Sequence, residues 1–399
     1  MKLSTFIIGI TLFGQLNSQI ITTPPSFSNL RAMAEWEEAQ ALTIAWTGFP
    51  AILKQIVAAG IEETHVLILS DDVTGTQDYL STANEGGPAI TNLDNITILP
   101  ANYNTIWLRD YAANPVYANE VDSLILVDWI YNRNRPQDDT SCEVIADHLN
   151  LPIYRTSEAP YDLMNTGGNY MSDGFGTAFA SHLVTDENDG TGDYGLNYPT
   201  HTEPEINNIM SEFMGINTYI KMQTLPYDGI HHIDMHMKLL DEETILVSEY
   251  PDGVADGPQI NANIQYVLSN YNSVFGTPYR IINIPAPPST AGNYPDNNGA
   301  YRTYSNAIFV NGTVLFPTYR EEYDTIAYRI WGEACPGYNL VGIDCDNQGN
   351  NIIAQSGAIH CITHTVGAQD PLLIRHQPLE DTYFNPNPFF VSAYARHRS

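Results

Sequence analysis

The stretch GAIHCITHT at residues 357–365 places one cysteine, Cys361, between two histidines. A cysteine attacks as a thiolate, so it needs cationic or hydrogen-bonding neighbours that lower its pKa. His360 is adjacent in sequence, but on an extended strand adjacent side chains point to opposite sides. A histidine brought in from elsewhere in the chain is therefore the better candidate for proton transfer, and we expect His360 and His364 to be secondary. From this stretch alone, Cys361 could be a nucleophile, one half of a disulfide, or a buried residue of the hydrophobic core.

A second stretch, GIHHIDMHMK, is dense in ionisable side chains. His232 and Asp234 are two residues apart, which on a strand places both on one face, with His236 continuing that face. A His/Asp/His face suits a divalent metal, but no H-E-x-x-H spacing supports one. The alternative is that His232 is a general acid/base and Asp234 a separate anchor.

A third stretch, TIWLRDY, places Arg109 and Asp110 directly after an apolar strand end. An Arg-Asp pair alone is most often a surface ion pair. Two carboxylates can, however, bracket the planar N–H fork of a guanidinium while a thiolate attacks its carbon and a histidine moves protons. A guanidine-modifying hydrolase requires that combination. A cysteine protease would leave Asp110 and Asp234 unexplained, because its imidazole is oriented by a single acidic or amide group.

The elements that must position these residues alternate between apolar strand-like runs and amphipathic helix-like stretches. Such alternation is typical of α/β architecture. We expect one extended domain over residues 22–380. The predicted strands are 64–70, 95–100, 123–131, 243–250, 279–286, 306–319 and 339–345; the predicted helices are 49–62, 202–215 and 256–274; and 34–50 is expected to pass from a helical acidic turn into an apolar stretch.

The chain begins with a lysine, an apolar run and small or polar residues, and residues 1–18 are therefore predicted to be a secretory signal peptide. No other stretch is apolar enough for a transmembrane helix, so a secreted or cell-surface location is expected. The formal charge of −30, from 16 Lys and Arg against 46 Asp and Glu, argues against nucleic acid and anionic membranes as partners. It favours solubility outside the cell, with attraction of cationic partners as the alternative.

Export also permits disulfides, and Cys335 and Cys345 are close enough in sequence to close a short loop. No C-x-x-C pair indicates zinc. The acidic run 186–193 could hold calcium, but it lacks the spacing of an EF-hand loop, and a solvated loop is preferred. Residues 385–399 are expected to be a linker followed by a strand whose partners are missing, the probable start of a truncated C-terminal Ig-like β domain that could attach the protein to a surface.

The order and spacing of several stretches resemble the guanidine-modifying enzymes, in particular the branch of bacterial peptidylarginine deiminases and agmatine deiminases. The resemblance implies a pseudo-symmetric α/β propeller of five ββαβ units around a central site, with no metal or organic cofactor. It implies roles for Cys361 as nucleophile, His232 as general acid/base, Asp110 and Asp234 as the guanidinium-holding carboxylates, Asn306 as a further site residue and Trp107 in the substrate channel. The stretches that carry the resemblance are residues 34–46, 107–117, 131–139, 167–178, 231–238, 302–319 and 341–363.

The resemblance also bears on the substrate. In the exported branch two arginines spaced by one residue bind the substrate's terminal carboxylate, and Arg133 and Arg135 stand in the matching NRNRP stretch. The expected reaction converts peptidyl arginine, preferably C-terminal, to citrulline and ammonia through a covalent thiouronium adduct, with arginine-containing peptides or proteins as partners. Thr166 and His364 depart from the glutamate and glutamine usual in agmatine deiminases.

Three alternatives stay open. The two arginines could instead pair with Asp138 and Asp139. The enzyme could act on agmatine, giving N-carbamoylputrescine for putrescine biosynthesis. The chain could also be a non-catalytic module whose acidic pocket holds arginine-rich partners.

Overall fold

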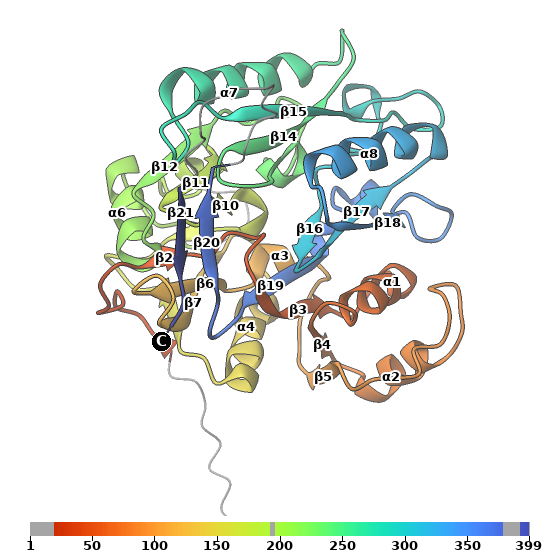
Figure 1. Cartoon of the computed structure of the whole chain (residues 1–399), viewed down its shortest axis with the longest axis horizontal. Coiled ribbons are helices and arrows are strands. Elements are labelled where there is room, and N and C mark those ends of the chain that lie inside the picture. Colours follow the sequence, from red (N-terminus) through yellow and green to blue (C-terminus); the bar gives the residue numbers. More distant parts are fainter. Residues whose placement is uncertain (1–19, 192–195, 378–391, 399) are drawn as a thin grey trace, which may run out of the picture.

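The computed structural model describes residues 20–191, 196–377 and 392–398, so the predicted leader at 1–18 lies outside the described residues. The predicted α/β class is confirmed, and the longer helices lie around the outside with the sheets nearer the middle (Figure 1). The helices are α1 Pro50–Gly60, α2 Val73–Ser81, α3 Leu108–Tyr111, α4 Pro136–Leu149, α5 Leu183–Asp186, α6 Glu203–Met214, α7 Gly257–Asn270 and α8 Glu321–Ala334, with 3₁₀ turns η1 Gly167–Asn169, η2 Ile233–Met235, η3 Pro295–Asn297, η4 Ile352–Gln355 and η5 His360–Ile362.

The strands form six separate sheets in the described part of the chain, and none of these sheets closes on itself. The strands are β1 Ile20–Ile21, β2 Arg31–Ala32, β3 Ala39–Ala45, β4 His65–Ser70, β5 Ile96–Pro100, β6 Asn114–Ala118, β7 Ser123–Tyr131, β8 Ile153–Thr156, β9 Met164–Asn165, β10 Met171–Ser172, β11 Thr177–Ser181, β12 Thr218–Met222, β13 Met237–Leu239, β14 Thr244–Glu249, β15 Arg280–Pro285, β16 Ile308–Val310, β17 Thr313–Thr318, β18 Asn339–Asp344, β19 Thr363–Gly367, β20 Leu373–His376 and β21 Ala393–Arg396.

Five of the sheets in the described residues share one connection. An antiparallel strand pair is followed by a helix and then by a strand parallel to the second of the pair. The units are β6-β7-α4-β8, β10-β11-α6-β12, β13-β14-α7-β15, β16-β17-α8-β18 and β19-β3-α1-β4. The last unit takes β19 from late in the chain and β3 from early in it, so it brings the stretch after Cys361 beside the N-terminal part.

Local sequence accounts for the helix boundaries. Thr202 and Glu205 form a capping box at the start of α6, and Gly215 ends it in a left-handed conformation. Proline stands in the first turn of α1, where its missing N–H costs nothing. The inner strands β3 and β4 read as continuous apolar runs because both of their faces are covered, and Leu42 and Ile68 are fully buried there.

Two possibilities raised by the sequence of the chain's later part are not found in the structure. All four cysteines are buried free thiols, and the pairing of Cys335 with Cys345 does not occur. The six-residue strand β18 lies between them, and at roughly 3.3 Å per residue it separates its ends far beyond the ~7 Å that a disulfide spans. The terminal strand β21 is not without a partner, since it pairs antiparallel with β20. The predicted Ig-like domain remains a prediction.

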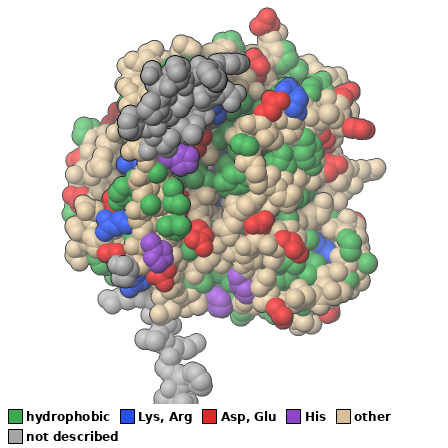
Figure 2. All heavy atoms as spheres, viewed as in Figure 1, with side chains coloured by type: hydrophobic (Ala, Val, Ile, Leu, Met, Phe, Trp, Pro, Cys, Tyr) green, Lys and Arg blue, Asp and Glu red, His purple; other side chains and the backbone are tan. Residues whose placement is uncertain are grey.

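The acidic segments also differ from expectation. Residues 35–37 form a turn rather than a helical turn before β3. In the described portion of 186–193, the Glu187 carboxylate accepts from Asn132 and the Asn188 side chain bonds to Met164, so both are engaged inside the protein. Acidic side chains are spread over the face in Figure 2. In the described residues no helix is long and apolar enough to cross a membrane.

Candidate active site

The candidate residues lie on short turns at the ends of strands. Asp110 is in the four-residue helix α3, with Trp107 at its N-cap, and Cys361 is in η5 immediately before β19. His232 is the N-cap of η2, and Asp234 lies within it. The helix α3 contacts both η1 and η5, and η1 contacts η2. Residues separated by up to about 250 positions in the chain are thereby brought to one place.

Asn306 holds the Cys361 turn. Its side-chain oxygen accepts from the backbone N–H groups of His360 (3.0 Å) and Cys361 (3.4 Å), and its Nδ2 donates to Cys361 Sγ at 3.2 Å. The thiol in turn lies 3.4 Å from Asp234 Oδ2. Burial, and then the negative charges of Asp234 and Asp110, hold the pKa of Cys361 well above its usual value. A cation placed between these carboxylates would oppose that effect and favour the thiolate.

Asp234 belongs to a chain of hydrogen-bonded ionisable groups. Its Oδ2 bonds to His360 Nδ1 at 2.7 Å, and His360 Nε2 bonds to Glu35 Oε2 at 2.7 Å. Burial acts to raise the pKa of Asp234, but the hydrogen bond and charge of His360 outweigh it, so the pKa lies below its usual value. Asp234 is therefore ionised at neutral pH and ready to hold a cation.

Glu35 ends this chain against two cations. Lys238 Nζ bonds to Glu35 Oε1, and Arg109 Nη2 lies 3.2 Å from Glu35 Oε2. Burial alone would raise the pKa of Glu35, but Lys238, His360 and Arg109 together hold it well below the usual range. Glu35 thus fixes the imidazole of His360 from the side opposite Asp234.

His232 and Asp110 lie close to each other in the site. Their Nδ1 and Oδ1 atoms are 3.5 Å apart, and neither imidazole nitrogen has a hydrogen-bond partner among the described residues. Burial lowers the pKa of His232 to about 4, so the ring is neutral at pH 7 and able to accept a proton. Burial and the charge of Asp234 raise the pKa of Asp110 to about 7.

Glycines leave the space around these side chains. A Cβ on Gly168 would come within 2.4 Å of His232 Nδ1 and 2.9 Å of Asp110 Oδ1. A Cβ on Gly357 would come within 2.3 Å of the Trp107 ring and 3.1 Å of Cys361 Cβ. Trp107 therefore lies next to Cys361, and the two glycines permit the close approach of four separate segments.

Arg133 and Arg135 are half-buried near the same carboxylate, because the charge of each acts to lower the pKa of Asp110. Arg133 Nη1 lies 3.5 Å from Glu187 Oε1, and Arg135 Nη1 donates to the Tyr131 hydroxyl at 3.0 Å. The alternative partners Asp138 and Asp139 have other hydrogen bonds. Asp138 accepts from Asn104 and Thr105, and Asp139 accepts from the backbone of Tyr131.

The structure corrects two sequence arguments about this site. His360 is not secondary, because η5 is a 3₁₀ turn rather than a strand, and both His360 and Cys361 reach Asp234. The segment holding His232, Asp234 and His236 is likewise a 3₁₀ turn, so strand alternation did not apply. In the described residues no three histidine, cysteine or acidic side chains are grouped as a metal site would require.

Comparison with known proteins identifies the family of this chain. The sequence model of the Porphyromonas-type peptidyl-arginine deiminases matches residues 31–366. The chain belongs to this family. Its members are deiminases that hydrolyse C–N bonds of guanidino groups.

Individual relatives carry different names. A Legionella pneumophila protein named "Putative agmatine deiminase" is 25% identical over 283 residues, covering 67% of this chain and 75% of that protein. The solved agmatine deiminase of Enterococcus faecalis superposes with a TM-score of 0.71 at 18% identity, covering 88% of this chain and all of that one. A Porphyromonas gingivalis structure described as a "Putative Arginine Deiminase" gives 0.69 at 18% identity, covering 85% and 99%. At these sequence identities, the structural similarity shows a shared fold and nothing more specific.

Proposed function

We propose that this deiminase acts on peptides ending in arginine, converting the C-terminal arginine to citrulline with release of ammonia. The observation that carries the proposal is that Arg133 and Arg135 lie close enough to Asp110 for the charge of each to lower the pKa of that carboxyl. A C-terminal arginine has a guanidinium at one end and a carboxylate at the other. Asp110 and Asp234 suit the first group, and the arginine pair suits the second.

The same arginines disfavour agmatine, which carries an ammonium and no carboxylate. Arg135 has a neutral hydroxyl as its hydrogen-bond partner, so it keeps a full positive charge near the place where that ammonium would lie. Glu187 is the observation that favours agmatine as a second candidate. Its carboxylate beside Arg133 offsets part of this charge, and curated relatives carry the agmatine deiminase name.

In the proposed mechanism the substrate guanidinium lies between Asp110 and Asp234, and its charge favours the thiolate of Cys361. Neutral His232 takes up the thiol proton of Cys361, the thiolate attacks the guanidinium carbon, and His232 delivers that proton to the departing ammonia. A water then gives its proton to His232 and attacks the thiouronium adduct, which releases the ureido product and the thiol. Trp107 lines the approach to Cys361.

The proposal extends to location and architecture. Residues 1–18 act as a signal peptide that exports the protein, as expected for an enzyme acting on peptides outside the cell. The five ββαβ units are arranged as the blades of a pseudo-symmetric propeller around the site.

The substrate is tested with three matched compounds. A short peptide ending in arginine, the same peptide with a C-terminal amide, and agmatine are each assayed for ureido product and ammonia. The free-acid peptide should give the highest kcat/KM, and the double variant Arg133→Gln/Arg135→Gln should raise KM for that peptide while leaving the amide unchanged. Preference for agmatine would replace the proposal with the second candidate, and no turnover of any compound would indicate a binding module.

A further inference from the structure

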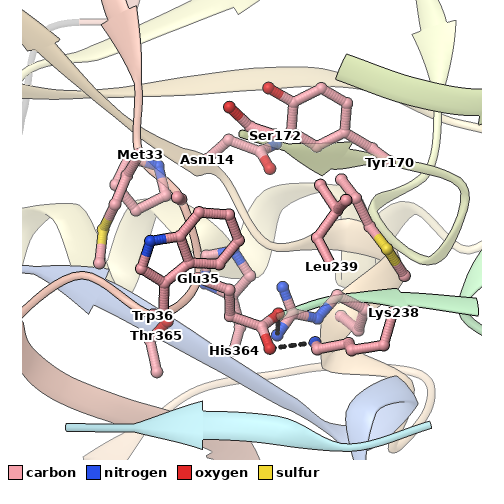
Figure 3. A pocket seen from close by; sticks show the side chains of 14 residues that line it. Met33, Glu35, Trp36, Asn114, Tyr170, Ser172, Lys238, Leu239, His364 and Thr365 are labelled. Atoms are coloured by element: carbon pink, nitrogen blue, oxygen red, sulfur yellow. Dashed lines mark hydrogen bonds and ion pairs between the residues drawn. The ribbon is translucent and has the colours of Figure 1, made fainter. Parts of the chain in front are cut away.

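A separate pocket with a cavity volume of about 50 Å³, partly open to solvent, lies on the other side of Glu35 from Cys361. Glu35 and Lys238 meet at its base, and Trp36 and Leu239 stand on either side (Figure 3). Neither Cys361 nor the carboxylates expected to hold the guanidinium line it. It is separated from Cys361 by the hydrogen-bonded chain from Glu35 through His360.

The base of this pocket has more positive than negative charge. Arg109 and Lys238 are two of only 16 Lys and Arg in a chain with 46 Asp and Glu, and both are buried there against the single carboxylate of Glu35. Asp234, the next carboxylate, lies beyond His360. Two buried cations that share one acid retain capacity for a further anion.

Two buried polar groups that line the pocket are incompletely satisfied. In the described part of the chain the Tyr170 hydroxyl has no hydrogen-bond partner, and Arg109 Nη2 has only its ion pair with Glu35, although both residues are more than nine-tenths buried. Buried donors of this kind are costly unless a ligand or water accepts from them. The side walls are apolar, from Trp36, Met171 and Leu239.

We propose that this pocket binds a small molecule with a carboxylate head and a short apolar body. The carboxylate accepts from Arg109 Nη2 and Lys238, and the apolar part lies between Trp36 and Leu239. Charged and polar groups that converge beside an apolar wall are typical of small-ligand sites. The site is independent of the proposed substrate, whose carboxylate is assigned to Arg133 and Arg135.

Butyrate serves as the probe, and binding to the full chain is measured by isothermal titration calorimetry. Butyrate should bind saturably, whereas butyramide, which has the same shape without the charge, and butylammonium, which carries the opposite charge, should not. Lys238→Gln should weaken binding at least tenfold. The matched control is Lys54→Gln, because Lys54 is also a buried lysine but donates to Thr82 and does not line the pocket. This variant should bind butyrate like wild type.

Further variants keep the test decisive. Trp36→Ala removes one apolar wall from a half-buried position and should also weaken binding, which covers the case in which Lys238→Gln does not fold. Binding should persist in Arg133→Gln/Arg135→Gln, because those arginines lie outside the pocket. Absence of saturable binding, equal binding by Lys238→Gln and Trp36→Ala, or loss of binding in the double arginine variant would each overturn the proposal.

Discussion

Replacing Asp110 by asparagine should make the protein more stable while abolishing activity. The pKa of Asp110 is raised from 3.8 to about 7, by burial first and then by Asp234. A carboxyl whose pKa is raised on folding binds its proton more tightly in the folded state. Its contribution to stability is therefore fully present below the unfolded pKa and is lost as the pH rises through about 7.

The size of the effect follows from the shift. Roughly three pKa units at about 1.4 kcal/mol each give about 4 kcal/mol of destabilisation at pH 8. At pH 5, about one unit above the unfolded pKa of an aspartate, the destabilisation is smaller, about 1.5 kcal/mol. Asparagine has the same shape without the charge, so Asp110→Asn should exceed wild type by up to these amounts.

Urea unfolding at pH 8 and pH 5, followed by circular dichroism, measures both differences. The exposed loop residue Asp94 supplies the control, and Asp94→Asn should change stability by less than about 0.5 kcal/mol at either pH. If Asp110→Asn is no more stable than wild type at pH 8, the assignment of Asp110 as a buried carboxylate with a raised pKa is wrong. The same holds if the difference in free energy of unfolding is not smaller at pH 5 than at pH 8. Its loss of activity should accompany the gain in stability.

Three further variants probe the site. Gly168→Ala places a methyl group against His232 and should remove activity, whereas Gly229→Ala, with open space around it, should retain wild-type kinetics; equal activity of the two would contradict the packing. Asn306→Ala removes the hydrogen bonds around the thiol and should lower kcat about 10- to 100-fold with intact folding by circular dichroism. Glu35→Gln leaves two buried cations less well compensated and should lower both kcat and the thermal midpoint; an unchanged midpoint would argue against the buried ion pairs.

Local sequence patterns predicted many of the elements but could not predict their assembly. The apolar and amphipathic spacing of TEPEINNIMSEFMG and FPAILKQIVAAGIE predicted α6 and α1 to within two residues at each end. The pairing of β19 with β3 joins segments more than 300 residues apart. Periodicity carries no information about such contacts, and the proximity of Asp110 to Cys361 was expected only from the family resemblance.

The two missed residues, His360 and Glu35, have different physical causes. Strand alternation placed His360 opposite Cys361, but in a 3₁₀ turn neighbouring side chains are not forced to opposite faces. Glu35 was expected in a helical acidic turn, and nothing local distinguishes a carboxylate that will be buried against Lys238 and Arg109. Its one available signal was its place in the AEWEEAQALTIAW stretch of the family resemblance.

Intact-protein mass spectrometry tests the central claim most directly. The wild-type chain is mixed with a peptide ending in arginine and quenched with acid within milliseconds to seconds. The account predicts a transient adduct equal in mass to protein plus peptide minus one ammonia, located on Cys361 by digestion and absent from Cys361→Ala. Turnover by Cys361→Ala, or an adduct on another residue, would contradict it.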